Sequence, residues 1–373
     1  MKSILEKKGE LKGKTVLLRL SLNVPLIEGK VESAFKLMKV LPTIEFLRNE
    51  GAKILLLGYI GRKGVETLEP VAEFFRKFFL LTFKKDILNK SLQEEIEKMK
   101  EGEVFLFENL RQYEGEENND TVFAQEIASL GDIYVNEAFP DSHRAYASIV
   151  GIPKFLDSYF GFSFIKEVGE LNTLSKTERP RLFVLGGNKL KTKLPFIEKV
   201  SQIADYVFVG GALSNEVFKF NGWEVGNSIL SGEDFDLTHL LENKKIIIPI
   251  DVVVENEKGE VLVKKPNEVQ KDEVIMDLGP ESLDLLKNKI KNSRFVLWNG
   301  PIGDYKKGYL ESTFDLIKTI VDSKAESIAG GGDTALCIEK LKLQDRFDFI
   351  SAGGGAMLDY VIDGTLVGID AIK

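Results

Sequence analysis

Short apolar runs that alternate with amphipathic segments are the feature that most restricts what this chain can fold into. A short apolar run fits a strand buried on both faces, and apolar residues at every third or fourth position fit a helix packed on that sheet. The strand-like runs are Thr15–Leu20, Lys53–Leu57, Val104–Phe107, Ile133–Val135, Leu182–Leu185, Tyr206–Val209, Lys245–Ile250, Arg294–Trp298, Ser327–Ala329 and Phe347–Ser351. The helix-like segments between the first of them are Leu41–Asn49, Pro70–Phe79 and Thr121–Leu130. The alternation predicts an α/β fold with two doubly wound, Rossmann-like parallel-sheet domains.

The length of 373 residues also favours two domains, because it exceeds what one hydrophobic core usually serves. The break is predicted between Gly151 and Pro180, around the helix-like segment Phe164–Leu174. That helix either joins the two domains as a hinge or packs wholly on one of them. The periodicity alone leaves both arrangements open.

Composition excludes several classes of protein. No window is apolar for long enough to cross a bilayer, and the first residues lack the apolar core of a signal peptide, so a cytoplasmic protein without a membrane partner is expected. The single cysteine, Cys337, rules out an internal disulfide framework, and with only two histidines any metal must be held by oxygen ligands. The net charge of −8 argues against a general nucleic-acid binder.

Four glycine clusters stand in the second half, each where an apolar run ends and a helix-like segment begins. Glycine lets the backbone turn sharply and approach a ligand, and a helix start offers unpaired N–H groups to an anion. The clusters are Gly186-Gly187, Gly210-Gly211, Gly330–Gly332 and Gly353–Gly355. They predict a phosphate-binding surface at the carboxyl ends of several strands.

Charged residues beside these clusters indicate a nucleotide site. Lys189 and Lys193 follow the first cluster, and Asp333 follows the third, where it could hold a magnesium ion or only cap a helix. The chain has no G-x-x-x-x-G-K-[ST] motif, so it is not a P-loop NTPase. Gly330-x-Gly332-x-x-Ala335 satisfies the loose dinucleotide pattern, but the next strand ends in glycines where a dehydrogenase would place an acid.

Polar residues and arginines follow the strand-like runs of the first half. Arg62, Arg111 and Arg144 each come shortly after a different run. Any one of them could be an ordinary solvated surface arginine. Together they fit a forked clamp for a small phosphorylated or carboxylated substrate.

Many short motifs occur in a fixed order along the chain. They are L-R-L-S-L-N-V-P at Leu18–Pro25, L-P-T-I at Leu41–Ile44, G-R at Gly61-Arg62, E-N-L-R at Glu108–Arg111, G-E-E-N-N-D at Gly115–Asp120, Y-V-N-E-A-F at Tyr134–Phe139, H-R-A at His143–Ala145, L-G-G-N-K at Leu185–Lys189, G-G-A at Gly210–Ala212, D-L-G-P at Asp277–Pro280, W-N-G-P at Trp298–Pro301, G-G-G-D-T-A at Gly330–Ala335 and S-A-G-G-G-A at Ser351–Ala356. Through these motifs the chain resembles the phosphoglycerate kinase family from near its start to its last residues.

This resemblance implies a kinase that moves a phosphoryl group between 1,3-bisphosphoglycerate and ADP, with Mg²⁺ as the ion that accompanies ATP or ADP. It implies a phosphoglycerate-binding domain over residues 1–160, an interdomain helix over 161–178 and a Mg-nucleotide domain over 179–360. A tail over 361–373 is expected to return to the first domain. A monomer whose domains close over the substrates is also expected from the family.

The resemblance assigns site residues by motif. In the acid site, Asn23 is expected on the carboxylate or hydroxyl end of phosphoglycerate, and Arg62, Arg111 and Arg144 on its phosphate end. The expected nucleotide-site residues are Gly186, Gly187, Lys189, Lys193, Gly210, Asn299, Pro301, Lys306, Gly331, Gly332, Asp333 and Thr334, with Asp333 on the metal. The transferring phosphoryl group is expected to meet Lys36, Lys189 and the backbone amides near Gly331 and Gly354.

The chain departs from the family at several of these positions. In the acid site, Ser21 replaces an aspartate of the R-x-D-x-N motif, Tyr59 replaces a histidine, and Lys36 stands where the family has its catalytic arginine. In the nucleotide site, Lys306 replaces a glutamate on the ribose, while Asn188 and Ala352 replace an alanine and a threonine of the glycine loops. A lysine keeps the charge of an arginine but loses its forked contact.

Three hypotheses follow, in this order. The first is an active, divergent phosphoglycerate kinase, because the nucleotide motifs and three arginines are intact. The second is a catalytically weakened relative that retains binding. The third is a kinase for another small phosphorylated acid, with Ser21 and Tyr59 reshaping the acceptor pocket.

Overall fold

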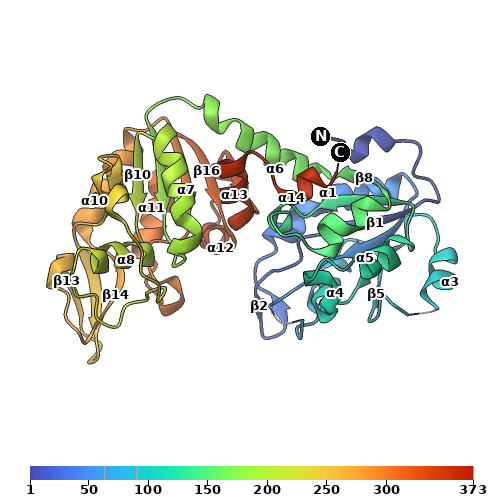
Figure 1. Ribbon diagram of the computed structural model, residues 1–373, viewed down its shortest axis with the longest axis horizontal. Coiled ribbons are helices and arrows are strands. Elements are labelled where there is room, and N and C mark those ends of the chain that lie inside the picture. Colours follow the sequence, from blue (N-terminus) through green and yellow to red (C-terminus); the bar gives the residue numbers. More distant parts are fainter. Residues whose placement is uncertain (63, 90, 373) are drawn as a thin grey trace. The chain divides into compact units, whose positions relative to one another are not determined.

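The computed structural model describes residues 1–62, 64–89 and 91–372. The chain forms two compact units, one of residues 1–171 together with the chain from Asp363 onward, the other of residues 172–362. Each unit contains one large parallel sheet with helices packed against it (Figure 1). Within the described ranges, no helix has the length and apolar character that crossing a bilayer requires.

The sheet of the first unit has the strand order β5-β6-β4-β1-β7-β8, with every neighbouring pair parallel. Its strands are β1 (Thr15–Leu20), β4 (Lys53–Leu57), β5 (Leu81–Lys84), β6 (Val104–Phe107), β7 (Ile133–Glu137) and β8 (Asp157–Phe160). The sequence predicts the four central strands and misses β5 and β8. Those two lie at the edges of the sheet, where a strand can carry polar residues, as L-T-F-K and D-S-Y-F do.

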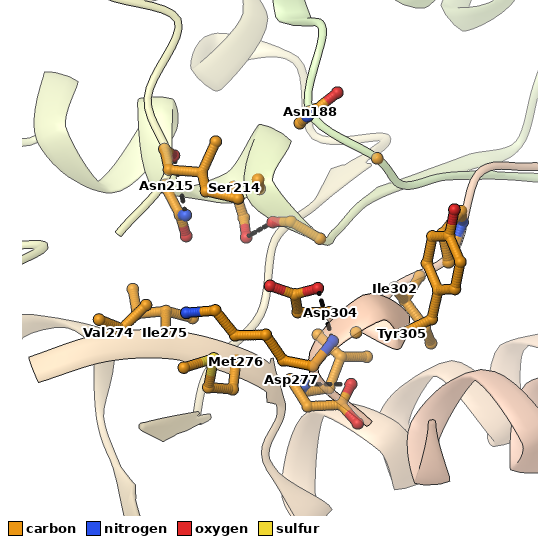
Figure 2. A pocket seen from close by; sticks show the side chains of 18 of the residues that line it. Asn188, Ser214, Asn215, Val274, Ile275, Met276, Asp277, Ile302, Asp304 and Tyr305 are labelled. Carbon is orange, nitrogen blue, oxygen red and sulfur yellow. Dashed lines mark hydrogen bonds between the residues drawn. The ribbon is translucent and has the colours of Figure 1, made fainter. Parts of the chain in front are cut away.

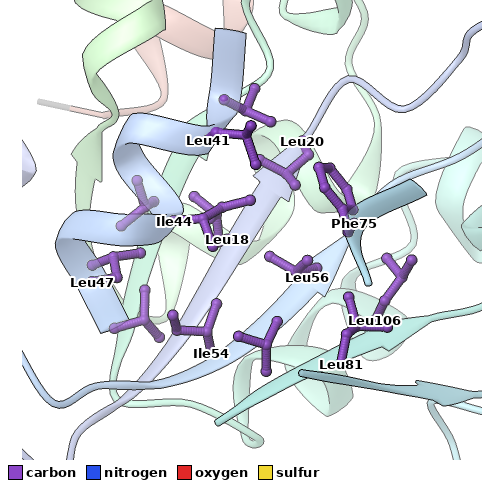
Figure 3. Close-up of a cluster of buried hydrophobic side chains, with 14 of the residues drawn as sticks. Leu18, Leu20, Leu41, Ile44, Leu47, Ile54, Leu56, Phe75, Leu81 and Leu106 are labelled. Atoms are coloured by element: carbon purple, nitrogen blue, oxygen red, sulfur yellow. The ribbon is translucent and has the colours of Figure 1, made fainter. Parts of the chain in front are cut away.

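The core of this unit forms where α1 (Phe35–Asn49) packs on the central strands. Leu41, Ile44 and Leu47 of α1 face Leu18 of β1 and Leu56 of β4 in Figure 3. The helix starts six residues before the predicted Leu41 and contains Pro42 as its eighth residue. Pro42 has no N–H to donate to Met38 O, so the helix gives up one backbone hydrogen bond there, and the buried side chains on both sides of Pro42 hold it against the sheet.

The remaining elements of the first unit are short. They are the hairpin β2 (Leu26–Ile27) and β3 (Lys30–Val31), and the helices α2 (Glu69–Phe75), α3 (Leu92–Glu97), α4 (Glu114–Glu117), α5 (Thr121–Ala128), α6 (Phe162–Asn172) and α14 (Val367–Asp370). The helix α6 covers most of the segment predicted to join two domains, and its role as a hinge stays a prediction. Near the C-terminus, Gly368 N donates to Ser142 O at 2.9 Å. The last residue of the predicted tail, Lys373, lies outside the described residues.

The sheet of the second unit has the order β11-β10-β9-β15-β16-β17 and is also parallel throughout. Its strands are β9 (Arg181–Leu185), β10 (Tyr206–Val209), β11 (Ile246–Ile247), β15 (Phe295–Asn299), β16 (Glu326–Gly330) and β17 (Phe349–Ser351). The helices are α7 (Leu190–Ile203), α8 (Ala212–Phe220), α9 (Thr238–Glu242), α10 (Pro280–Lys291), α11 (Glu311–Val321), α12 (Gly332–Leu341) and α13 (Gly355–Asp363). The predicted strand Lys245–Ile250 shrinks to two residues, because Pro249 has no N–H to offer a neighbouring strand.

A small antiparallel sheet in the second unit was not predicted. Its order is β13-β12-β14, with β12 (Val252–Asn256), β13 (Val261–Lys264) and β14 (Glu273–Leu278). Val252 and Val254 of β12 pack with Phe218 of α8 in a separate apolar cluster. This sheet matters for the site because β14 forms one wall of a pocket.

Candidate functional site

The first candidate site lies in the loops after β1, β4, β6 and β7, at the carboxyl end of the first unit's sheet. Asn23 Oδ1 accepts a hydrogen bond from Gly61 N at 3.0 Å, and Gly61 O accepts one from Arg111 Nη1. Lys36, in the first turn of α1, donates from Nζ to Asn23 O at 3.4 Å. The structure therefore brings the predicted residues Asn23, Lys36 and Arg111 together around Gly61.

Two tyrosines hold Arg111 and Arg144 next to each other. Tyr146 Oη accepts from Arg111 Nη2 at 2.7 Å and from Arg144 Nη1 at 3.0 Å. It also donates to Glu117 Oε1 at 3.0 Å. Tyr59 Oη accepts from Arg144 Nη1 at 3.4 Å, and its ring centre lies 3.8 Å from Arg111 Cζ. Two adjacent guanidinium groups suit an anion with several oxygens, such as a phosphate.

A buried ion pair supports Tyr59. Arg19 of β1 is fully buried and donates from Nη1 to Asp141 Oδ2 at 3.0 Å, while Tyr59 Oη donates to Asp141 Oδ1 at 2.8 Å. Burial alone would raise the pKa of Asp141, but the charges of Arg19 and Lys36 and the Tyr59 hydroxyl hold it below its usual value. Burial, together with the Asp141 charge, raises the pKa of Tyr59 far above its ordinary value. Tyr59 therefore stays protonated and remains a hydrogen-bond donor.

Ser21 and Arg62 take different places from the other predicted acid-site residues. Ser21 is only 3% exposed, and its Oγ finds no hydrogen-bond partner among the residues that the structure describes. Arg62 is exposed and follows Gly61 directly, the residue whose backbone contacts both Asn23 and Arg111. A buried hydroxyl without a partner costs free energy, so Ser21 Oγ is an unsatisfied polar atom of this site.

The second candidate site is built mainly from backbone, at the carboxyl end of the second unit's sheet. Gly186 N donates to Asn299 O at 2.9 Å, and Gly187 N donates to Pro301 O at 2.9 Å. A Cβ on Gly186 would lie 2.2 Å from Pro301 O, and one on Gly211, whose φ is +60°, would lie 2.9 Å from Gly187 N. Only glycine permits these loops to pack backbone against backbone.

Lys193 joins two of these loops from the first turn of α7. Its Nζ donates to Gly186 O and, at 3.1 Å, to Asn299 O, and the residue is only 8% exposed. The pKa of Lys193 is lowered to about 7, chiefly by burial and in smaller part by the charge of Lys189, while the charge of Asp333 opposes the shift. Lys193 is therefore close to its point of deprotonation at neutral pH. Lys189 is exposed at the residue that precedes α7.

A pocket of about 380 Å³ opens beside the glycine loops. In Figure 2, Ser214 and Asn215 of α8 lie on one side of it, and Val274, Ile275 and Met276 of β14 lie on the other. The volume is typical of small-molecule sites, which enclose roughly 300–1,000 Å³. The lining combines an apolar wall with amide and hydroxyl groups, which suits a flat heteroaromatic ring with polar edges.

Some of the predicted nucleotide residues line this pocket and others do not. Gly187, Pro301, Lys306 and Asp333 are among the lining residues. The lining does not include Gly186, Lys189, Lys193, Gly210, Asn299, Gly331, Gly332 or Thr334. Two of the second group, Lys193 and Gly186, contact each other and help to fix the loops.

The start of α12 carries the predicted phosphate-binding residues. Thr334 Oγ1 accepts from Gly300 N at 2.9 Å, and Asp333 Oδ1 accepts from Tyr305 Oη at 2.8 Å. The N-cap of α12 is Gly331, with a φ of +103°, so the interpretation of Asp333 as the helix cap is wrong. A Cβ on Gly354 would lie 3.5 Å from Gly331 Cα, which puts these two glycine loops against each other.

Asp333 is also the residue that could contact a magnesium ion. Among the described residues, no group of three or more His, Cys, Asp or Glu side chains could hold a metal alone. Mg²⁺ usually takes one or two carboxylates and completes its shell with phosphate oxygens and water. An exposed carboxylate in the first turn of α12 fits that mode of binding.

Sequence reasoning missed several residues that build the two sites. In the first they include Arg19, Asp141 and Tyr146, and in the second Asn215 and Tyr305. An arginine inside an otherwise apolar strand, L-R-L, was a signal that a buried counter-ion must exist. Nothing local in the sequence marks the other four.

Comparison with known proteins decides the family. The family model described as phosphoglycerate kinase matches residues 6–364. The chain belongs to the phosphoglycerate kinase family. Phosphoglycerate kinases are kinases that transfer phosphate to a carboxyl group, and the resemblance drawn from the motifs is confirmed.

Individual phosphoglycerate kinases align with nearly the whole length of the chain. The phosphoglycerate kinase of Dictyoglomus turgidum is 35% identical over 391 residues, covering 100% of this chain and 99% of the relative. That of Coprothermobacter proteolyticus is 37% identical over 379 residues, covering 96% of each.

Among solved structures, phosphoglycerate kinase from Pyrococcus horikoshii aligns with a TM-score of 0.87 and 27% identity, covering 100% of this chain and 98% of that one. The structure from Coxiella burnetii aligns with a TM-score of 0.77 and 30% identity, covering 97% and 96%. The predicted pair of Rossmann-like parallel-sheet domains is therefore confirmed.

Proposed function

We propose that this chain catalyses the reversible transfer of a phosphoryl group between 1,3-bisphosphoglycerate and ADP, which yields 3-phosphoglycerate and ATP. The observation that carries the proposal is a division of chemistry between the two units. In the first unit, two arginines donate hydrogen bonds to a tyrosine hydroxyl. In the second unit, lysines and glycine loops lie beside a pocket. A small phosphorylated acid and a nucleotide are the ligands that these two arrangements fit.

The acid substrate is proposed to bind in the first unit. Arg111 and Arg144 would take the phosphate end, since their guanidinium groups already lie side by side on Tyr146. Arg62 would add a third cation from the exposed loop after Gly61. Asn23 would meet the carboxylate or hydroxyl end, with Ser21 and Tyr59 nearby in the same set of loops.

The nucleotide is proposed to bind in the second unit. Its base would lie between α8 and β14, in the pocket that Pro301 and Gly187 help to line. Lys193 and the start of α12, with Gly332 and Thr334, would meet the phosphate oxygens. Lys306 would lie at the ribose. Gly186, Gly210 and Asn299 would act indirectly, by holding the loops that make contact.

Magnesium is proposed to reach the site with the nucleotide. It would supply positive charge between phosphate oxygens, and Asp333 would be its protein ligand. The hydrogen bond from Tyr305 to Asp333 fixes the direction of that carboxylate at the pocket wall.

The transfer itself needs no covalent enzyme intermediate. In the direction of ATP formation, a β-phosphate oxygen of ADP bonds to phosphorus while the bond from phosphorus to the carboxyl oxygen breaks. Lys36 and Lys189 would stabilise the negative charge on the moving group, and the backbone amides near Gly331 and Gly354 would donate to it. Catalysis then consists of positioning and charge stabilisation.

The acid groups and the nucleotide groups belong to different units, so we also propose that the units close on each other during turnover. A cytoplasmic monomer is proposed on the same family grounds.

A coupled assay of ATP-dependent phosphorylation of 3-phosphoglycerate tests the proposal. We expect turnover that depends on both substrates and on Mg²⁺. Turnover at background with retained Mg-ATP binding would instead support a weakened binding protein. Faster turnover of a different phosphorylated acid would support an altered acceptor, for which the unpartnered buried Oγ of Ser21 is the relevant observation.

A further inference from the structure

Tyr59 is surrounded by three arginines, two beside its ring and one at its hydroxyl. The ring face lies 3.8 Å from Arg111 Cζ, and Arg19 Cζ lies 5.3 Å from the same ring centre. The hydroxyl oxygen accepts from Arg144 Nη1 at 3.4 Å. A π face attracts cations and a phenol oxygen has lone pairs to accept with, so one uncharged side chain binds three cations at once.

The hydroxyl proton has its own fixed partner. Tyr59 Oη donates to Asp141 Oδ1 at 2.8 Å, and Asp141 is held in turn by fully buried Arg19. Tyr59 is itself 2% exposed, so the ring cannot swing away without opening the core. The phenol is therefore locked in position and in hydrogen-bond direction.

A second aromatic residue completes the arrangement. The ring of Tyr146 meets that of Tyr59 edge-on, with 6.1 Å between centres, and its hydroxyl contacts both Arg111 and Arg144. The two guanidinium groups repel each other. Glu117 Oε1, 3.1 Å from Arg111 Nε, and Gly61 O also hold Arg111, but Tyr59 and Tyr146 are the groups that contact both arginines. The tyrosine pair keeps them together before any anion arrives.

We infer that Tyr59 is a positioning residue that holds Arg111 and Arg144 ready for the phosphate group of the acid substrate. The inference rests on the proposed function for the identity of that substrate, although the same arginines would bind inorganic phosphate in its absence. A pre-ordered arginine pair binds an anion more tightly because less side-chain entropy is lost on binding. Tyr59 therefore affects the affinity for the phosphate end of the acid substrate and does not affect the affinity for the nucleotide.

Two substitutions separate the ring from the hydroxyl. Tyr59→Phe keeps the ring beneath Arg111 and removes the hydroxyl, so we expect the KM for 3-phosphoglycerate to rise about fivefold. Tyr59→Leu removes the ring as well, and the rise should reach about fiftyfold. In both variants kcat and the KM for ATP should stay within about twofold of the wild type, since the loss lies in ground-state binding of one substrate.

Tyr159→Phe is the matched control. Tyr159 also donates to a carboxylate, Asp157 Oδ2 at 2.5 Å, and carries a cation over its ring, with Lys2 Nζ at 4.6 Å from the centre. It lies on β8 and contacts neither Arg111 nor Arg144 in the described structure. Tyr159→Phe should leave both KM values unchanged, although its chemical change is the same.

Titration with inorganic phosphate, in the absence of any substrate, gives a readout independent of the reaction. The dissociation constant of phosphate should rise in the same order, from wild type to Tyr59→Phe to Tyr59→Leu. If Tyr59→Leu does not fold, the Tyr59→Phe measurement decides alone. Equal phosphate affinity in wild type and Tyr59→Phe, or equal losses for acid and ATP, would overturn the inference. A wild type that binds phosphate but does not turn over 3-phosphoglycerate would overturn the proposed function and leave the role of Tyr59 to be judged by the titration.

Discussion

The two units hold their candidate sites in different ways. In the first unit, side chains make the site: Arg111 and Arg144 are fixed by Tyr59 and Tyr146, and the buried Arg19–Asp141 pair fixes Tyr59. In the second unit, backbone makes the site, because glycine loops pack so closely that a Cβ would collide. The two sites should therefore be sensitive to different kinds of substitution. Changes of charge should damage the first, and added methyl groups should damage the second.

The largest effect is expected from removing the buried charge of the first unit. Asp141→Asn removes the carboxylate that pairs directly with the buried Arg19 guanidinium and leaves Glu116 as the other buried acid whose charge acts on it, which should cost about 3 kcal/mol of unfolding free energy. Urea denaturation measures it. The matched Asp157→Asn change breaks an exposed pair with Lys2 and should cost less than about 1 kcal/mol. Similar losses in the two variants would mean that the buried pair does not support the fold.

The pH dependence of Asp141 has a definite sign. Its pKa lies below the usual value of 3.8, so its contribution to stability is present above about pH 4 and is lost as the pH falls through its folded value. In Asp141→Asn, the free energy of unfolding should therefore fall less steeply than in the wild type as the pH is lowered below about 4.

The next effect probes the backbone site. Gly186→Ala places a methyl group 2.2 Å from Pro301 O, and the loops must shift to make room. We expect a loss of about 2 kcal/mol in unfolding free energy and weaker binding of ADP by calorimetry. Gly332→Ala meets no atom within 4 Å, so its unfolding free energy should stay within about 1 kcal/mol of the wild type. A stable Gly186→Ala that binds ADP normally would break the distinction between the two sites.

Lys193 offers a smaller, pH-dependent effect in the second unit. The folded pKa is about 7 and the ordinary one is 10.5, so between these values the unfolded chain binds the extra proton and stability rises with pH. The gain between pH 7 and pH 8 should be about 1 kcal/mol. Lys193→Met should remove this slope, and Lys191→Met, on the exposed face of the same helix, should keep it. An unchanged slope in Lys193→Met would show that Lys193 is not the titrating group.

The smallest effect concerns the rate. Lys36→Arg supplies the forked contact that a lysine lacks, and we expect kcat to rise about threefold. Lys39→Arg lies one turn further along α1, where Lys39 pairs with Glu167, and should leave kcat unchanged. A rate that does not rise in Lys36→Arg would show that Lys36 is not the group aligned with the transferring phosphoryl.

Much of the fold could be predicted because central strands are read directly as apolar runs. β1, β4, β6 and β10 have the predicted ends. The edge strands β5 and β8 could not be found this way, since an edge tolerates polar residues. The small antiparallel sheet lies outside the βα alternation, so a pattern built on that alternation passes over it.

The two candidate sites also differ in how well the sequence predicts them. Glycine carries its conformational signal in the sequence itself, so the sequence alone predicts the loops at Gly186-Gly187 and Gly330–Gly332. Tyr146 and Asp141 carry no such signal, because their part depends on which side chains the fold places opposite them. The loss of a carboxylate expected at Ser21 illustrates this limit. A buried carboxylate does exist at Asp141, where it pairs with Arg19 two residues before Ser21.

Paired titrations of 3-phosphoglycerate and of Mg-ADP into wild type and Arg111→Lys test whether side chains make the first site and backbone makes the second. Arg111→Lys keeps the positive charge and removes the stacking on Tyr59 and the forked contacts, so only the side-chain site should be affected. We expect the dissociation constant for 3-phosphoglycerate to rise about thirtyfold, or about 2 kcal/mol, while that for Mg-ADP changes less than about twofold. Equal losses for both ligands, or none for the acid, would contradict this division between the two sites.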